Sequence, residues 1–173
     1  MTPLVGQKVT LRRFIEDDIT ATYIGWLNDR ETMRFSNQRF SLHDRQTSQH
    51  YLNSFTQSDN SFYTVREKTS GRMIGTMTAY LSRAHGTADM GILIGDRAAW
   101  GQGFGHDAWI TLMEFLLAQT GIRKVTAGTL ACNAPMLRVA AKSGMVPDGQ
   151  RKLQEVVDGR PSDVLYFAKF DGA

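Results

Sequence analysis

Hydrophobic and polar residues alternate along four segments in the first half of the chain, a spacing that is typical of β-strands. Residues 8–14 predict the first strand. Residues 62–66 and 73–80 predict two more, and the polar turn at residues 69–72 joins them as a hairpin. Residues 87–94 predict the fourth strand, which leads into a glycine-rich segment.

Two helices are predicted between the first strand and the hairpin. One covers about residues 17–28, because the acidic run at residues 16–18 suits the positive end of a helix dipole. The other is expected to have Ser41 as its N-cap and to run through Phe55. Residues 29–39 between them are predicted to be irregular or short-helical.

Two further helices are predicted in the second half. The first has apolar residues at helical spacing after residue 106 and is expected to end just before Gly121. The second begins near Pro135 and is expected to end at Gly144. Strands are expected over residues 124–130, 146–157 and 164–170. The order of elements predicts a mixed α/β or α+β sheet, and the lack of repeats and linkers predicts a single domain over residues 1–173.

Composition narrows the possible functions. The 20 Lys and Arg residues against 17 Asp and Glu leave a formal net charge of +3, which is too small to favour nucleic acid as a partner. One cysteine and four histidines favour neither a disulfide framework nor a metal site. No apolar run reaches the roughly 18–20 residues of a membrane span. We therefore expect a cytoplasmic protein that uses no metal and contacts no membrane.

A glycine-rich turn, Trp100-Gly101-Gln102-Gly103-Phe104-Gly105-His106, connects the strand predicted at residues 87–94 to a helix. Such a turn directs several backbone amides and the positive end of the helix at one point, which is typical of a phosphate-binding cradle. The alternative is a purely structural strand-to-helix turn. The turn lacks the Gly-Lys-Ser/Thr ending of a P-loop and the glycine spacing of the dinucleotide fingerprint, so neither of those sites is favoured.

In this context the segment Trp100–Gly105 resembles the signature of the GCN5-related N-acetyltransferases, with Trp in place of the usual Gln or Arg. Residues 133–136 (Asn-Ala-Pro-Met) and 142–145 (Lys-Ser-Gly-Met) are similar to the family's second motif and lie at its spacing. Residues 11–13 and 25–29 resemble the branch of ribosomal-protein N-terminal acetyltransferases and amino-sugar acetyltransferases. The resemblance implies a mixed, mostly antiparallel sheet of six to seven strands with about four flanking helices.

The resemblance also implies that acetyl-CoA is the co-substrate and that its acetyl group moves directly to a primary amine. In such enzymes the pantetheine arm pairs with the free backbone edge of the strand before the turn, and an amide near Leu93 polarises the thioester carbonyl. The resemblance also implies which residues bind acetyl-CoA. They are Ile92, Leu93, Ile94, Gly95, Gln102, Gly103, Phe104, Gly105, His106, Asn133 and Lys142.

A general base is needed because an amine is mostly protonated at neutral pH. The resemblance places a base at Asp89, four residues before Leu93, and the alternative is an exposed carboxylate with no role in catalysis. Asp29 and Glu31 are weaker candidates on the acceptor side. Asn133 is expected to bind the cofactor or an ordered water, with a helix cap as the alternative.

The family's usual general acid is a Tyr seven residues after the motif Asn, and Ala140 stands at that position here, so no acid is assigned. This departure supports an alternative function, a non-catalytic acyl-CoA-binding or regulatory domain. Cys132 is expected to be a buried small side chain rather than an acyl-carrying nucleophile. His43, His50 and His85 are expected at the surface.

The first two predicted helices and the loop at residues 158–163 are expected to select the acceptor, as the resemblance implies. Their arginines, interleaved with aromatic residues, are a candidate site for an acidic or phosphorylated acceptor. The alternative is a solvated basic face paired by carboxylates of the same stretch. These arginines are Arg30, Arg34, Arg39 and Arg45. The acceptor is expected to be a small amine or amino sugar, or a protein N-terminus, and the resemblance allows a homodimer.

Overall fold

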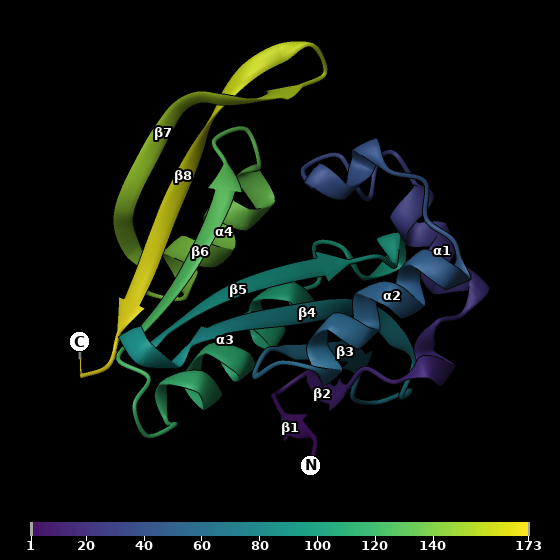
Figure 1. Ribbon diagram of the computed structural model, residues 1–173, viewed down its shortest axis with the longest axis horizontal. Helices are drawn as coiled ribbons and strands as arrows, with labels where there is room; N and C mark the ends of the chain where they lie inside the picture. Colours follow the sequence, from purple (N-terminus) through teal and green to yellow (C-terminus); the bar gives the residue numbers. More distant parts are fainter. Residues whose placement is uncertain (1, 173) are drawn as a thin grey trace.

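Eight strands form one mixed sheet in the computed structural model, which describes residues 2–172 (Figure 1). The strands are β1 (Leu4–Val5), β2 (Val9–Arg13), β3 (Ser61–Glu67), β4 (Met73–Ser82), β5 (Thr87–Ile94), β6 (Lys124–Leu130), β7 (Val146–Val157) and β8 (Arg160–Phe170). Their order is β1-β2-β3-β4-β5-β6-β8-β7, and β5 and β6 alone are paired in parallel. The mostly antiparallel sheet is confirmed. The strand beyond the expected six to seven is β1, whose two residues are too few to show a period.

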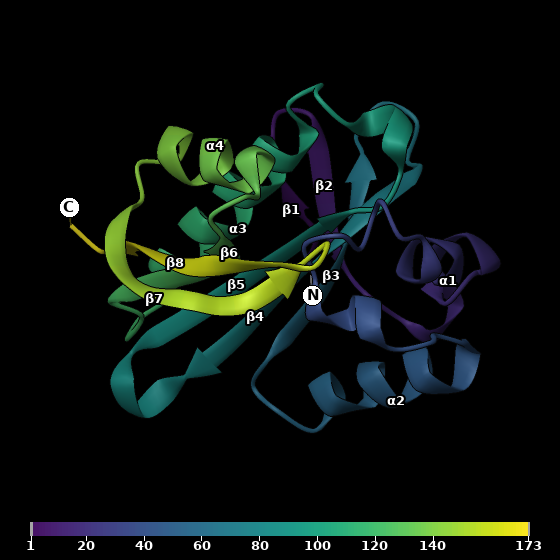
Figure 2. The same cartoon turned by 90° about the horizontal axis from the view of Figure 1, so that it is seen from above.

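Four α-helices flank this sheet, as expected. They are α1 (Ala21–Asn28), α2 (Arg45–Thr56), α3 (Phe104–Leu117) and α4 (Ala134–Lys142). Seen from above, α3 and α4 lie on one face of the sheet, and α2 lies on the other with α1 beside it (Figure 2). Short 3₁₀ turns cover residues 16–18, 37–40, 83–85 and 97–99.

Both predicted helix starts in the first half were wrong. Helix α1 begins at Ala21, with Thr20 as its N-cap, because the acidic residues before it form a separate 3₁₀ turn. Helix α2 begins at Arg45, and its N-cap is Asp44, whose carboxylate accepts the Thr47 amide at 2.7 Å. Ser41 instead ends the 3₁₀ turn before it. Ser and Asp have similar N-cap preferences, so the choice between them depended on the chain leading into the helix.

The last two strands form a tight hairpin. Asp158 and Gly159 are the two residues of its turn, and both have positive φ, 48° and 77°. This is the backbone geometry that matches the twist of the flanking strands. Pairing therefore starts at once, from Val157 opposite Arg160, and β8 begins four residues before the predicted start at residue 164.

Two hydrophobic clusters stabilise the two faces of the sheet. Helix α3 packs on one face and buries Trp109 and Leu112 completely. The second cluster lies beneath α1 and α2, where Phe14 stacks on Phe62 and Phe62 on Phe55, with ring centroids 4.3 Å and 5.1 Å apart. The first cluster holds the glycine-rich turn, and the second holds the segments expected to select the acceptor.

Asp18 fixes the segment before α1 to the sheet. Its carboxylate is 4% exposed and lies 2.5 Å from the Arg12 guanidinium and 2.8 Å from that of Arg66. It also accepts the Ile15 amide at 2.9 Å. Removing one partner of a buried ion pair leaves the other charges without compensation, which is costly.

We expect Asp18→Ala to lower the free energy of unfolding by about 3–5 kcal/mol, because it leaves the guanidinium groups of Arg12 and Arg66 without their partner. Asp17→Ala, one residue earlier in the same 3₁₀ turn and exposed, should change it by no more than about 0.5 kcal/mol. Urea titrations of the two variants and the parent protein measure both effects. Equal losses in the two variants would contradict the role given to Asp18.

Candidate active site

Strands β5 and β6 pair over only three residue pairs, from Thr87–Lys124 to Asp89–Thr126, and then diverge. Figure 1 shows the wedge that opens between them, with β4 continuing beside β5 and β8 beside β6. Beyond Asp89, β5 has no ladder partner on the wedge side. Unpaired strand edges present backbone donors and acceptors that an extended ligand can pair with.

Backbone groups of alternate residues in β5 face the wedge. The Gly86 carbonyl, at the start of the strand, accepts the Arg123 amide from the β6 side at 2.8 Å, so the even-numbered residues face that way. Leu93 faces β4 instead, since a Cβ on Gly75 of β4 would lie 2.2 Å from the Leu93 carbonyl oxygen. The amide that can reach a ligand in the wedge is therefore that of Ile92, and not the expected Leu93 amide.

The chain that leaves β5 is held close to it. Trp100 donates its indole N–H to the Ile94 carbonyl at 2.7 Å. Gly95 is buried against Trp26, and a Cβ on Gly95 would lie 2.1 Å from an atom of that indole ring. Gly95 was expected to bind the cofactor, and its close approach to Trp26 gives it a packing role as well.

The glycine-rich turn has the geometry of an anion-binding cradle. Gly101 and Gly103 have φ of 73° and 85°, which glycine adopts without strain. The first hydrogen bond of α3 runs from the Asp107 amide to the Gly103 carbonyl at 3.0 Å. The amides of residues 104–106 therefore have no acceptor within the described chain. These amides and the positive end of α3 suit a phosphate.

The underside of this cradle is anchored to the start of β2. The Asp107 carboxylate accepts three successive backbone amides, those of Gln7, Lys8 and Val9, at 3.0, 2.8 and 3.0 Å. The Lys8 ammonium donates to the Gln102 carbonyl at 2.8 Å. These bonds fix the turn and the helix end in place before a ligand arrives, which favours binding.

Asp89 lies where the wedge opens. Its carboxylate accepts the Thr126 hydroxyl at 2.7 Å, and Tyr80 of β4 is its partner on the other side in the sheet. Asp89 is exposed to solvent, yet the protein atoms around its carboxylate raise its pKa by desolvation, while the bond from Thr126 acts in the opposite direction. A carboxylate with a raised pKa beside an open ligand site is suited to accept a proton.

The two weaker base candidates lie elsewhere. Asp29 pairs with Arg97 at 2.5 Å, and this hydrogen bond is the main reason that the pKa of Asp29 is lowered to about 2. Such a carboxylate is a poor base at neutral pH. Glu31 is exposed on the same loop.

The second motif forms the turn between β6 and α4. Asn133 is the N-cap of α4: its side chain accepts the Met136 amide at 3.3 Å and donates to the Thr129 hydroxyl at 3.0 Å. Lys142 is exposed in the last turn of the helix. Cys132 is exposed, not buried as expected, because the turn itself lies at the surface.

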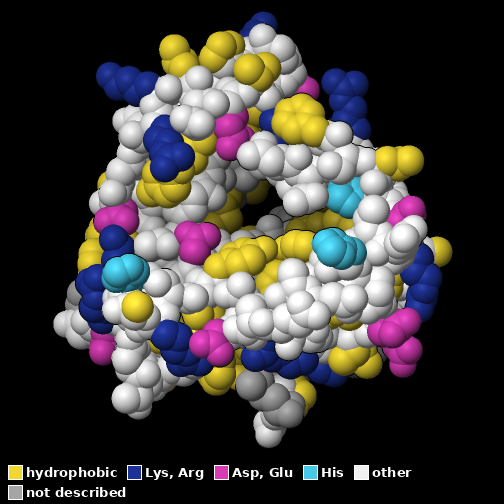
Figure 3. Space-filling model, viewed as in Figure 1, with side chains coloured by type: hydrophobic (Ala, Val, Ile, Leu, Met, Phe, Trp, Pro, Cys, Tyr) yellow, Lys and Arg dark blue, Asp and Glu magenta, His cyan; other side chains and the backbone are white. Residues whose placement is uncertain are grey.

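A cavity of about 570 Å³ lies between α2 and the sheet face that carries Gly91 and Leu93. Figure 3 shows it as a hollow with apolar and histidine side chains at its edge. His43 lines it and is half-buried, with Nε2 3.0 Å from the Gln38 carbonyl oxygen. His50 also lines the cavity and is exposed.

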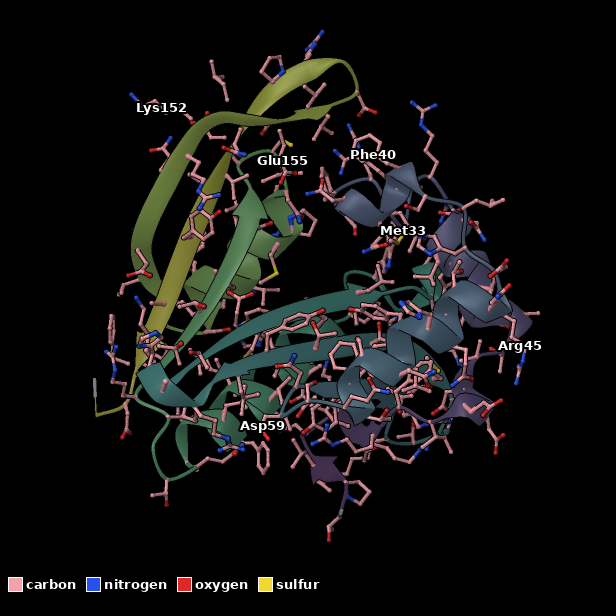
Figure 4. The ribbon with its side chains drawn as sticks, in the orientation of Figure 1. Met33, Phe40, Arg45, Asp59, Lys152 and Glu155 are labelled. Atoms are coloured by element: carbon pink, nitrogen blue, oxygen red, sulfur yellow. The ribbon has the colours of Figure 1, made fainter. Side chains whose placement is uncertain are left out.

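A polar bridge joins the arm at residues 29–43 to the β7–β8 hairpin. It consists of Arg34 with Asp158 at 3.0 Å and Asn37 with Glu155 at 2.9 Å. In Figure 4, Glu155 and the arm face each other. The arm and the hairpin, far apart in sequence, are therefore in contact.

The arginines expected to hold an acidic acceptor take part in such contacts. Their partners are mostly residues of the hairpin, and not the expected carboxylates of their own stretch. Arg30 lies 3.6 Å from Asp158, Arg39 donates to the Val156 carbonyl at 2.8 Å, and Arg45 lies 3.4 Å from Glu16. Each of the four guanidinium groups therefore has a partner within the protein, and Arg30 and Arg34 share the carboxylate of Asp158.

Comparison with known proteins identifies the family. A family model described as an acetyltransferase (GNAT) domain matches residues 8–146. The chain belongs to the GNAT acetyltransferases. A search of the curated proteins found no match.

Several GNAT enzymes of known structure have the same fold. A ribosomal L7/L12 α-N-protein acetyltransferase in complex with coenzyme A is 17% identical, with a TM-score of 0.85 over 98% of both chains. Spermidine N-acetyltransferase from Vibrio cholerae, in complex with CoA and spermine, is 17% identical, with a TM-score of 0.83 over 95% of this chain and 96% of that one. A microcin C7 self-immunity acetyltransferase in complex with acetyl-CoA and AMP is 15% identical, with a TM-score of 0.80 over 95% and 93%.

Two further observations describe this GNAT chain. Across residues 2–172, no helix is long and apolar enough to cross a membrane. The same residues contain no group of three or more His, Cys, Asp or Glu side chains that could hold a metal ion.

Three residues that line the cavity were not singled out as site residues from the sequence. Ser48 and Tyr51 of α2 line the cavity together with Thr78 of β4. The Tyr51 hydroxyl lies 2.8 Å from that of Tyr80, and burial raises the pKa of Tyr51, so its hydroxyl stays neutral. No local motif marks these residues, because the cavity exists only where distant segments meet.

We expect Asp89→Asn to raise the midpoint of thermal unfolding at pH 7. The folded state raises the pKa of Asp89, so the fold favours the protonated form and loses stability as the pH rises above the ordinary carboxyl range near 3.9. Asn is uncharged and can still accept the Thr126 hydroxyl. The gain should vanish toward about pH 3, where the carboxyl is neutral in both states.

Calorimetry of this variant and the parent protein between pH 3 and pH 7 measures the difference. Asp17→Asn, which removes a charge from an exposed residue, controls for net charge. If the unfolding midpoint of Asp89→Asn minus that of the parent protein were smaller at pH 7 than at pH 3, a raised pKa of Asp89 would be refuted.

Proposed function

We propose that this protein transfers the acetyl group of acetyl-CoA to a primary amine, in one complex that holds both substrates. The observation that carries the proposal is the cradle at the start of α3, placed directly beside the free edge of β5. The first suits a pyrophosphate and the second an extended amide-containing arm, and coenzyme A has both. The CoA and acetyl-CoA complexes of the structurally similar enzymes support this choice.

The residues around the wedge fit this co-substrate. Gly101 is open, with no atom within 4 Å of the place of a Cβ, and Gly105 would bring a Cβ no closer than 3.4 Å to the Ile94 side chain. The cradle residues that would hold the pyrophosphate through backbone amides are Gln102, Gly103, Phe104, Gly105 and His106. The Ile92 backbone would pair with the arm. When bound, acetyl-CoA supplies a thioester that an amine can attack.

In this proposal Ile92 donates its amide N–H to the oxygen that gains charge during the attack. One such donor is worth about 3–4 kcal/mol in other acyl-transfer enzymes. Asp89 accepts the proton that the amine must lose, directly or through water, and Thr126 orients its carboxylate. Asn133 supports the site by fixing the start of α4.

No residue is proposed as the general acid. Ala140, at the position of the family's usual Tyr, is fully buried in the core beneath α4, so no side chain reaches the wedge from there. A thiolate leaves without prior protonation more readily than an alkoxide, because a thiol has a pKa of about 8.5. Solvent can then protonate it.

The acceptor is a primary amine on a small molecule, such as an amino sugar, or on a protein N-terminus. The named activities of the similar enzymes include an α-N-protein and a spermidine acetyltransferase. We expect the enzyme to act in the cytoplasm.

Gly105→Glu tests the cradle. The added carboxylate should weaken acetyl-CoA binding by at least about 100-fold, because like charges at short range in a partly buried site repel by several kcal/mol. Gly105→Ala should bind within a few-fold of the parent protein, since its Cβ meets Ile94 at an ordinary contact distance. Isothermal titration calorimetry with acetyl-CoA gives the dissociation constants of both variants. Unchanged affinity in the Glu variant would contradict the proposal that the cradle binds the pyrophosphate.

Asp89→Asn tests the base. We expect kcat to fall by about 100-fold at neutral pH, with the loss of a proton acceptor. In the parent protein kcat/KM should rise with pH as Asp89 ionises, at a pKa above the ordinary 3.9. The variant should lack this rise. Free-thiol release measured from pH 5 to pH 9 gives the pH profiles of the variant and the parent protein. Identical profiles would show that Asp89 is not the base. Tight CoA binding without release for any amine would instead indicate a binding domain.

A further inference from the structure

The cavity beside the wedge carries almost no charge. Its lining contains no Asp, Glu, Lys or Arg side chain, and His43 and His50 are its only groups that can become cationic. The rest of the lining is aromatic, aliphatic or hydroxylated, with Tyr23, Tyr51 and Phe62 among its walls. An acceptor with a second charge would lose the hydration of that charge in the cavity and would gain no ionic partner, which is costly.

Several polar groups of this lining are already engaged by the protein. The Tyr51 hydroxyl meets that of Tyr80 at 2.8 Å, and the Ser54 hydroxyl donates to the Tyr51 carbonyl at 2.7 Å. The His43 ring nitrogen Nε2 lies 3.0 Å from the Gln38 carbonyl oxygen. These groups shape the cavity and have little capacity left for a ligand.

Ser48 differs from these groups because its hydroxyl is both buried and without a partner. It is 3% exposed, lies on the inner face of α2 and lines the cavity. Its Oγ is buried and has no hydrogen-bond partner in the structure. A buried hydroxyl without a partner costs free energy, and a serine in a helix ordinarily has a carbonyl oxygen within reach. Such a group in a cavity wall marks the place where a polar atom of a ligand belongs.

We propose that the acceptor has a body without charge apart from its reacting amine, and that a neutral polar atom of this body bonds to the Ser48 hydroxyl. The inference rests on the proposed acetyl transfer and narrows its acceptor class. It selects against polyamines, amino acids with a free carboxylate and phosphorylated amines. Ser48 is a specificity-determining residue that contacts the acceptor away from the reacting atoms.

Four amines of matched shape test this assignment. Tyramine has a neutral hydroxyl, phenethylamine has none, 4-(2-aminoethyl)benzylamine has a second cation, and 4-(2-aminoethyl)benzoate has an anion. We expect kcat/KM to be highest for tyramine. Phenethylamine should be lower by about fivefold, the worth of one neutral hydrogen bond, and both doubly charged amines by more than about tenfold. A preference for either charged amine would overturn the proposal.

Variants of two serines on α2 locate the interaction. Ser48→Ala should bring the tyramine-to-phenethylamine ratio of kcat/KM close to one. Ser54→Ala is the matched control, because its hydroxyl is already donated to the backbone, and its ratio should equal that of the parent protein. An unaltered ratio in Ser48→Ala would remove Ser48 from acceptor recognition.

A charge added at the rim tests whether the acceptor binds in this cavity. Ser41 is exposed and lines the cavity, so Ser41→Glu should fold normally. It should raise kcat/KM for 4-(2-aminoethyl)benzylamine relative to kcat/KM for tyramine. Saturation-transfer NMR with the same four amines gives their binding order independently of turnover. If acetyl-CoA is not consumed with any amine, the proposed function fails, and the binding order still decides this inference.

Discussion

The brief parallel pairing of β5 and β6 is the constraint on which the site depends. Each strand keeps a long antiparallel partner on its outer side, so the sheet remains continuous while the inner edges separate after Asp89 and Thr126. The separation leaves backbone groups without partners in the middle of a protein, where water or a ligand must satisfy them. The site is thus an interruption in a sheet, placed between two halves that are each well packed.

Rigid contacts around the wedge make this interruption specific. The Trp100 indole donates a hydrogen bond to the Ile94 carbonyl, and the Asp107 carboxylate accepts three backbone amides at the start of β2. The cradle, the strand edge and Asp89 are therefore held by groups that belong to different elements of one core. A ligand that binds there meets donors already in position, and little conformational entropy remains to be lost.

Sequence analysis succeeded where the determinant is local. Gly101 and Gly103 mark the cradle because their backbone angles need glycine, and the strands follow from their alternation. It failed where several local solutions are similar, as at Ser41 and Asp44. Two further features could not be predicted: the direction of the Leu93 backbone, which is set by the register between strands, and the cavity around Ser48, which six separate segments form. Such features depend on contacts between distant residues that no short pattern encodes.

The bridge between the arm and the hairpin joins two parts of the chain that are far apart in sequence. Arg34 and Asp158 are 124 residues apart, and Arg30 lies 3.6 Å from the same carboxylate. All three side chains are about half exposed or more. Exposed ion pairs are weak and are screened by salt. The position of the arm relative to the hairpin should therefore respond to ionic strength, whereas the buried core of the sheet should not.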